Sequence, residues 1–152
     1  MDSLPPDFFV TSMQFTPTTH RDVYPTIDPT STALSQKGKV IAITGATRGL
    51  GRRAFVNSFA KASPKGIVLI ARSASDLDAT AEEVKAIDPS IEVLKGQADL
   101  LDSNGISKIW SQVKDKFGHA DVIVHNAGVL EIGSVAEMDP DTWWREIVSQ
   151  IP

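Results

Sequence analysis

Three glycines lie close together in a segment whose spacing suits phosphate binding: Thr44-Gly45-Ala46-Thr47-Arg48-Gly49-Leu50-Gly51. Gly45 would let the chain turn sharply, Gly49 would let the backbone approach a phosphate, and Gly51 would allow close packing of a helix on a strand. Free amides and the dipole at a helix start favour negative charge. The segment therefore predicts a pyrophosphate-binding loop, and the alternative is an ordinary glycine-rich turn.

Two arginines stand where they could add positive charge to this loop. Arg48 lies inside it, and Arg72 comes directly after the apolar run 67–71 and before Ser73. The next acidic residue along the chain is Asp76. Planar guanidinium groups suit phosphate oxygens, so we expect both arginines to converge on one phosphate group. The alternative is that both are solvated surface side chains.

Two polar segments follow later apolar runs. Asp99-Leu100 comes after the run 91–95, and Asn126-Ala127-Gly128 comes after the run 121–125. Each sequence by itself is typical of a turn or a cap. Their position after apolar runs makes them candidate ligand-binding segments, because ligands of open α/β sheets bind outside the carboxyl ends of the strands.

The elements that would position these residues alternate from Lys39 onward. Short apolar runs predict buried parallel strands over residues 40–44, 67–71, 91–95 and 121–125. A helix over 49–62 is expected to bury Leu50, Ala54, Phe55 and Phe59. The next two helices have the inner faces Leu77, Ala81, Val84, Ile87 and Ile106, Ile109, Trp110, Val113, Phe117. Ser103 is expected to cap the second of these, and a last helix begins near Asp139-Pro140.

This alternation predicts an α/β fold, a Rossmann-type doubly wound parallel sheet with strand order 3-2-1-4. Residues 38–152 form this domain. Residues 1–37 form an extended, Pro-rich N-terminal arm, because repeated prolines exclude a long helix. Its expected apolar anchors are Phe8, Phe9, Phe15, Tyr24 and Ile27.

Composition excludes several kinds of site. The 152 residues carry a net charge of −4, which gives no global reason to expect nucleic acid or an anionic membrane as a partner. There is no cysteine, and the three histidines fit no metal-ligand spacing. No apolar run is long enough to span a bilayer, and the first residues lack a signal-peptide pattern. We therefore expect a soluble, cytoplasmic protein without a metal.

The spacing Thr-Gly-x-x-x-Gly-x-Gly at residues 44–51 resembles that of the short-chain dehydrogenase/reductase family. Asp99-Leu100 resembles the family's adenine-contacting pair. Asn126-Ala127-Gly128 resembles the end of its Asn-Asn-Ala-Gly motif, with His125 replacing the first asparagine. The similarity runs from about Gly38 to at least Trp144.

The resemblance implies a dinucleotide as the ligand. Members that prefer NAD carry an acid after the second strand, where this chain has Arg72, so a 2′-phosphate and hence NADP(H) is favoured over NAD(H). The implied cofactor-binding residues are Thr44, Gly45, Thr47, Arg48, Gly49, Leu50, Gly51, Arg72, Ser73, Asp99, Leu100, Asn126, Ala127 and Gly128.

The same resemblance implies no catalytic residue in this chain. The family uses a tyrosine with a lysine four residues on, whereas the single tyrosine, Tyr24, is followed at that distance by Asp28. The asparagine of the family's fourth helix would fall near Gln150. We therefore expect the cofactor-binding half of an NADP(H)-dependent oxidoreductase that reduces carbonyls or oxidises alcohols, C-terminally incomplete and inactive alone.

Two alternatives stay open at this point. The chain is a non-catalytic dinucleotide-binding or interaction module, or it is half of a split enzyme. In either case the fourth strand, with Val122, Ile123 and Val124, is expected to expose an apolar edge that offers a surface for self-association. Of the adjacent Trp143 and Trp144, one is expected to pack inward.

Overall fold

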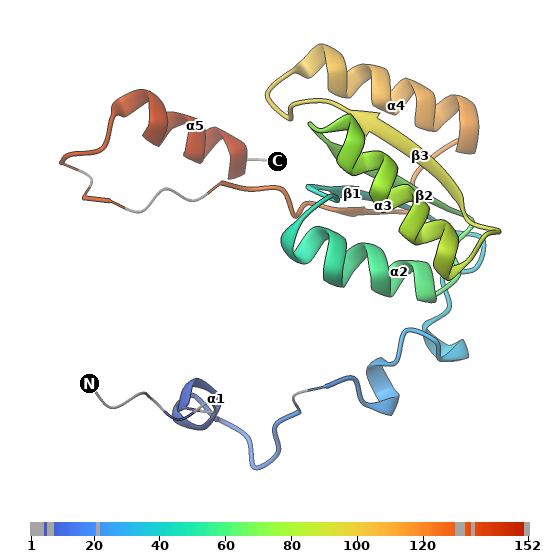
Figure 1. Ribbon diagram of the computed structural model, residues 1–152, viewed down its shortest axis with the longest axis horizontal. Helices are drawn as coiled ribbons and strands as arrows, with labels where there is room; N and C mark the ends of the chain where they lie inside the picture. The colour runs from blue at the N-terminus through green and yellow to red at the C-terminus, as the bar shows by residue number, and fades with distance from the viewer. Residues whose placement is uncertain (1–4, 6–7, 21, 130–132, 135, 151–152) are drawn as a thin grey trace.

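A parallel four-stranded sheet forms the body of the protein in the computed structural model, which describes residues 5, 8–20, 22–129, 133–134 and 136–150 (Figure 1). The strands are β1 Val40–Thr44, β2 Gly66–Ala71, β3 Glu92–Gln97 and β4 Val122–Val124. Their order is β3-β2-β1-β4. The predicted doubly wound sheet is thus confirmed, including its strand order.

Helices cover both faces of the sheet (Figure 1). The helical segments of the body are η3 Gly51–Val56, which is π-helical, α2 Asn57–Lys61, α3 Ala74–Ile87, α4 Ser103–Phe117 and α5 Pro140–Gln150. Alternate strand residues face opposite layers, as the pleat requires. Ile41, Ile43 and Ile67 pack on the side of α2 and α3, and Val40 and Ala42 pack on the side of α4.

Two local predictions are corrected. Leu50 is 70% exposed and does not belong to the inner face of the first helix. Phe55 and Phe59 pack half-buried against the core as predicted, and the fully buried residues of this face are Gly51, Val56 and Ala60. Small residues at this face let the helix approach the sheet closely. The cap of α4 is Asp102, whose carboxylate accepts a hydrogen bond from the Asn104 amide, and Ser103 is the first residue of the helix.

In its described residues the arm carries only short helical turns, which are α1 Phe8–Ser12, η1 Pro25–Ile27 and η2 Thr32–Leu34. It extends away from the sheet (Figure 1). Phe15 is 99% exposed, so its prediction as an anchor is wrong; Phe8 and Ile27 are also exposed, and the side chain of Phe9 is outside the described part. Tyr24 is half-buried and stacks on the His20 ring.

The last helix, α5, lies apart from the sheet and from the helices that cover it (Figure 1). Trp143 and Trp144 are 43% and 59% exposed, and their rings lie 6.3 Å apart at a tilt of 36°. The prediction that one of them packs inward is therefore wrong. Neither ring belongs to the hydrophobic core on either face of the sheet.

Strand β4 pairs with β1 in parallel register, with Ala42 opposite Ile123. Within the described residues no strand pairs with its other side. Val122 and Val124 pack against the layer of α2 and α3, whereas Ile123 is 44% exposed. An exposed apolar residue is present on this strand, as predicted, but self-association through it stays a prediction.

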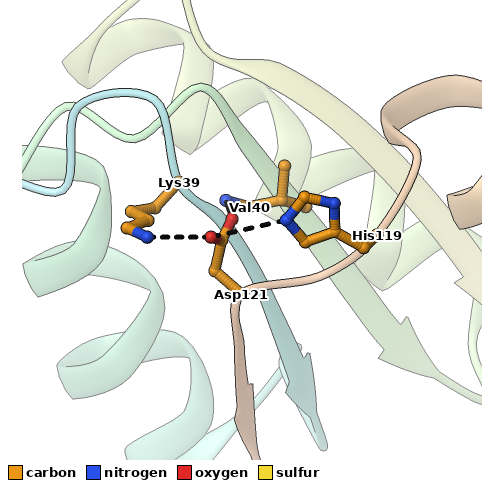
Figure 2. A network of polar contacts seen from close by, with 4 residues as sticks. All are labelled: Lys39, Val40, His119 and Asp121. Atoms are coloured by element: carbon orange, nitrogen blue, oxygen red, sulfur yellow. Dashed lines mark hydrogen bonds and ion pairs between the residues drawn. The ribbon is translucent and has the colours of Figure 1, made fainter.

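A carboxylate fastens the amino ends of β1 and β4 together (Figure 2). The Asp121 side chain, 17% exposed, accepts a hydrogen bond of 2.8 Å from the Val40 amide and one of 2.9 Å from Lys39 Nζ. His119 Nε2 lies 3.6 Å away. The pKa of Asp121 is lowered below its ordinary value of 3.8. The larger cause is the hydrogen bond from the Val40 backbone amide, and the second is the hydrogen bond from Lys39.

This arrangement predicts an acid-dependent contribution to stability. Because the pKa of Asp121 is lower in the folded than in the unfolded chain, the contribution is complete above about pH 3.8 and is lost as the pH falls through the lowered folded value. Asp121→Asn should therefore lower the urea midpoint at pH 7, and the difference from the wild type should shrink below pH 3.8.

The matched control is Asp115→Asn, which alters an exposed carboxylate on α4. It should leave the urea midpoint near that of the wild type at both pH values. An Asp121→Asn midpoint equal to that of Asp115→Asn at pH 7 would contradict the prediction.

Candidate functional site

A cavity of about 660 Å³ opens at the carboxyl edge of the sheet. Segments that follow all four strands border it, which is where ligands of open α/β sheets bind. The volume lies within the range of small-molecule sites. Its lining consists of Gly45, Thr47, Arg48, Gly49, Leu50, Ile70, Ala71, Arg72, Ser73, Asp76, Ala98, Asp99, Leu100, Leu101, Asn126, Ala127, Gly128 and Val129.

The glycine loop turns out of β1 by means of left-handed backbone. Gly45 has a φ of +63° and Gly49 a φ of +53°, values that L side chains rarely adopt. A Cβ atom on Gly49 would meet no heavy atom within 4 Å. The backbone at this position is therefore open to a close approach from outside.

Gly51 has a different purpose, because it faces the protein rather than the cavity. A Cβ atom there would lie 2.1 Å from the Gly45 carbonyl oxygen and 2.6 Å from the Asn126 amide nitrogen. Only glycine allows η3 to begin this close to the end of β1. This contact fixes where the helix start lies relative to the cavity.

Asn126 ties the carboxyl ends of β1 and β4 together. Its side-chain amide donates to the carbonyl oxygens of Thr44 at 2.9 Å and Gly45 at 3.3 Å. The Thr44 hydroxyl in turn accepts from the backbone amides of Asn126 and Ala127, both at 3.1 Å. The loop after β4 is thereby held against the glycine loop by the side chains of Thr44, at the end of β1, and of Asn126 itself.

Arg48 and Arg72 both line the cavity and are exposed. Arg72 Nη1 lies 3.7 Å from a carboxylate oxygen of Asp99, and its side chain is 65% exposed. Exposed ion pairs of this kind are weak, with a median of about 0–1 kcal/mol. The guanidinium is consequently available to an anionic group that enters the cavity.

The loop after β2 leads into α3. The Ser73 hydroxyl accepts a hydrogen bond of 3.3 Å from the Asp76 amide and caps this helix. Gln97, at the end of β3, donates through its side chain to the Arg72 carbonyl oxygen at 3.1 Å. These contacts hold the backbone of the Arg72 segment while its side chain stays exposed.

Most of the residues predicted from the sequence gather around this one cavity. Thr44 and Gly51 do not line it; both are buried behind the loop, where they position it. Six further residues line the cavity but were not among the binding residues predicted from the sequence: Ile70, Ala71, Asp76, Ala98, Leu101 and Val129. Each lies within a few residues of a predicted one, so the ends of the apolar runs are the signal that would have found them.

Metal ligation and membrane insertion find no support in the described ranges. No group of three or more histidine, aspartate or glutamate side chains is placed there to hold a metal ion. Nor does any helix in this part of the chain have the length and apolar character needed to cross a membrane.

Comparisons with known proteins all identify short chain dehydrogenases and reductases as similar to this chain. The short chain dehydrogenase family model matches residues 39–150. The short chain dehydrogenase pigC of Monascus ruber is 42% identical over 147 residues, which are 93% of this chain and 45% of that protein. Versicolorin reductase stcU of Emericella nidulans is 31% identical over 108 residues, 71% of this chain and 40% of that protein. The chain thus spans less than half of the length of these relatives.

The solved structures that resemble this chain include reductases and oxidoreductases as well. L-sorbose reductase from Gluconobacter frateurii, complexed with NADPH and L-sorbose, superposes with a TM-score of 0.67 at 30% identity, covering 76% of this chain and 46% of that one. A metagenomic short-chain oxidoreductase in complex with NADP gives a TM-score of 0.66 at 32% identity, covering 74% of this chain and 49% of that one.

Proposed function

Because this chain belongs to the short chain dehydrogenase family, we propose that its cavity binds NADP(H) and that the chain supplies the dinucleotide-binding half of an oxidoreductase. The observation that carries the proposal is the convergence of the glycine loop, two exposed arginines and the Asn126 segment on one cavity at the carboxyl edge of the sheet. Such an edge, with a helix start beside it, suits a pyrophosphate.

The residues present fit a dinucleotide. The open backbone at Gly49 admits the pyrophosphate, and Thr47 and Leu50 belong to the same loop. Asp99 and Leu100 border the cavity beyond β3, where we assign the adenine. Asn126, Ala127 and Gly128 lie on the β4 side, where we assign the adjoining ribose.

The preference for NADP(H) over NAD(H) follows from charge. Arg48 and Arg72 approach the cavity from the loops after β1 and β2, and each can donate several hydrogen bonds to a 2′-phosphate. An NAD-specific site would place a carboxylate directly after β2, where this chain has Arg72 and Ser73. The NADPH and NADP complexes among the similar structures support the same assignment.

Removing either arginine should change the relative affinity for the two dinucleotides. Arg48→Ala and Arg72→Ala are each expected to weaken NADPH binding about tenfold, because hydrogen bonds to charged groups contribute about 1.5–3 kcal/mol. NADH binding should change little, since NADH lacks the 2′-phosphate. Fluorescence or calorimetric titration of the wild type and both variants measures the two dissociation constants.

Arg53→Ala is the matched control, because Arg53 is an exposed arginine of η3 that does not line this cavity. It should leave the NADPH to NADH ratio at the wild-type value. An unchanged ratio in both Arg48→Ala and Arg72→Ala would refute the assignment of the 2′-phosphate.

Binding rather than turnover is the appropriate readout for the 152-residue chain. In the proposed oxidoreductase the cofactor gives or accepts a hydride, and a protein group must move the accompanying proton. Within this sequence the tyrosine and lysine of the family pattern have no counterpart, since Tyr24 is followed four residues later by Asp28. Reduction of a carbonyl or oxidation of an alcohol therefore requires residues that this chain does not contain.

A further inference from the structure

We propose that Arg52 and Glu83 form a clamp that positions Arg48 for the 2′-phosphate and so sets the dinucleotide selectivity of the cavity. This inference rests on the proposed NADP(H) function. In this inference Arg52 is a positioning residue, whereas Arg48 and Arg72 are the arginines assigned to contact the phosphate. The supporting observations are the geometry of the Arg52–Glu83 pair, the backbone link to Arg48 and the placement of α3.

The pair has two parallel hydrogen bonds. Arg52 Nε donates to Glu83 Oε2 at 2.9 Å, and Arg52 Nη2 donates to Glu83 Oε1 at 2.7 Å. This fork arrangement fixes the direction of both side chains, which a single ion pair does not do. The hydrogen bond from Arg52 lowers the pKa of Glu83 below its ordinary range, so the carboxylate is charged at neutral pH.

The clamp is linked directly to the glycine loop. The Arg52 amide donates to the Arg48 carbonyl oxygen at 3.3 Å, so Arg48 lies one helical turn before the clamp. Arg52 belongs to η3, whose π-helical turns are a rare geometry that is found often at functional sites. A tertiary bond from inside η3 to α3 therefore helps to determine where the loop that carries Arg48 ends and η3 begins.

The other end of the clamp belongs to a helix whose start also borders the cavity. Glu83 lies on α3, and Ser73 and Asp76 at the start of that helix line the same cavity as Arg48. A second hollow lies between η3 and α3; it is lined by Arg52 and Glu83 and shares Arg48 with the main cavity. The clamp thus joins η3, which follows the glycine loop, to α3, which follows the Arg72 segment.

The charge of the pair also restricts which arginine meets the ligand. Arg52 is occupied by Glu83, whereas the Arg48 guanidinium has no acidic partner within the described part of the chain. Asp76 and Glu83 both attract Arg52, so the arginine is held on the α3 side. Arg48 is left as the cation of this loop that faces the cavity.

The test is a charge-swap series read out by the ratio of NADPH to NADH dissociation constants. Arg52→Ala and Glu83→Ala should each lower the preference for NADPH about threefold to tenfold, the size of coupling expected within a shared network. The double exchange Arg52→Glu with Glu83→Arg should restore most of the preference, because it rebuilds the pair. Asp78→Ala is the control, since it removes the Asp78–Lys95 ion pair from the same helix without touching the clamp.

The outcomes separate the clamp from the proposed function. If the wild type does not bind NADPH, the proposed function fails and the clamp with it. If Arg48→Ala lowers the preference while Arg52→Ala and Glu83→Ala keep the wild-type ratio, the clamp alone is overturned. If the double exchange fails to recover a ratio lost in Arg52→Ala while its unfolding midpoint is normal, Arg52 contacts the phosphate itself and the positioning purpose is overturned.

Discussion

Replacing Gly51 by alanine is expected to cause the largest loss of any single substitution at this site. The added methyl carbon would lie 2.1 Å from the Gly45 carbonyl oxygen, which is backbone and cannot rotate away as a side chain would. Either η3 or the glycine loop must shift, and overpacking of this kind costs about 1–3 kcal/mol, occasionally more. Because the glycine loop lines the cavity and η3 begins directly after it, we expect Gly51→Ala both to lower the unfolding free energy and to abolish measurable NADPH binding.

Urea unfolding and NADPH titration of the same preparation measure the two effects. Gly133→Ala provides the control, because among the described residues a Cβ atom there would meet only the end of Met138 at 3.7 Å, an ordinary contact. It should leave both quantities unchanged. Wild-type binding by Gly51→Ala would show that the close approach of η3 to β1 is not needed for the site.

Loss of the Asn126 side chain should have the second largest effect. Its amide supplies hydrogen bonds to the Thr44 and Gly45 carbonyl oxygens, and Asn126→Ala leaves both without that donor. A buried group without its partner costs about 1–3 kcal/mol, so the unfolding free energy should fall by about that amount. NADPH affinity should fall as well, because the loop after β4 loses its attachment to the glycine loop.

Asn126→Asp makes a sharper version of the same test. Its carboxylate would face two carbonyl oxygens, so at pH 7 the variant should be less stable than Asn126→Ala. In the folded chain this environment disfavours the charged form and raises the pKa of the new carboxyl. The deficit should therefore shrink as the pH falls and the group gains a proton that it can donate. The unfolding midpoint as a function of pH checks this.

Asn104→Ala is the matched control for this pair, since Asn104 is an exposed asparagine in the first turn of α4. Its unfolding midpoint should stay near the wild-type value across the same pH range. Equal midpoints for Asn126→Asp and Asn126→Ala at pH 7 would contradict the described direction of the hydrogen bonds.

The sheet and the glycine loop could be predicted because their signals are local. The β-branched runs define β1 and β2 within one residue, and the spacing of Gly45, Gly49 and Gly51 has a direct steric meaning at each position. The strand order followed from the right-handed crossover between parallel strands. None of these inferences needs a contact between distant residues.

The parts that could not be predicted depend on such contacts. Leu50 has the composition of an inward residue, but Gly51 occupies the inner face because the helix approaches the sheet too closely for a side chain. The Arg52–Glu83 pair joins residues 31 positions apart, and the Asn126 bonds to Thr44 join residues 82 apart. Trp143 and Trp144 have the size of core residues, and only the placement of α5 shows that they are exposed.

The strands β1 and β4 are fastened at their two ends by groups of different chemistry. The amino ends share the ionised carboxylate of Asp121 with the ammonium of Lys39, whereas the carboxyl ends share the neutral amide of Asn126 and the hydroxyl of Thr44. Of these two attachments, acid and high salt therefore weaken the one at the amino ends, which is remote from the cavity. Substitutions at Lys39 and Asp121 give a means of adjusting the resistance of the fold to acid and salt without altering the lining of the cavity.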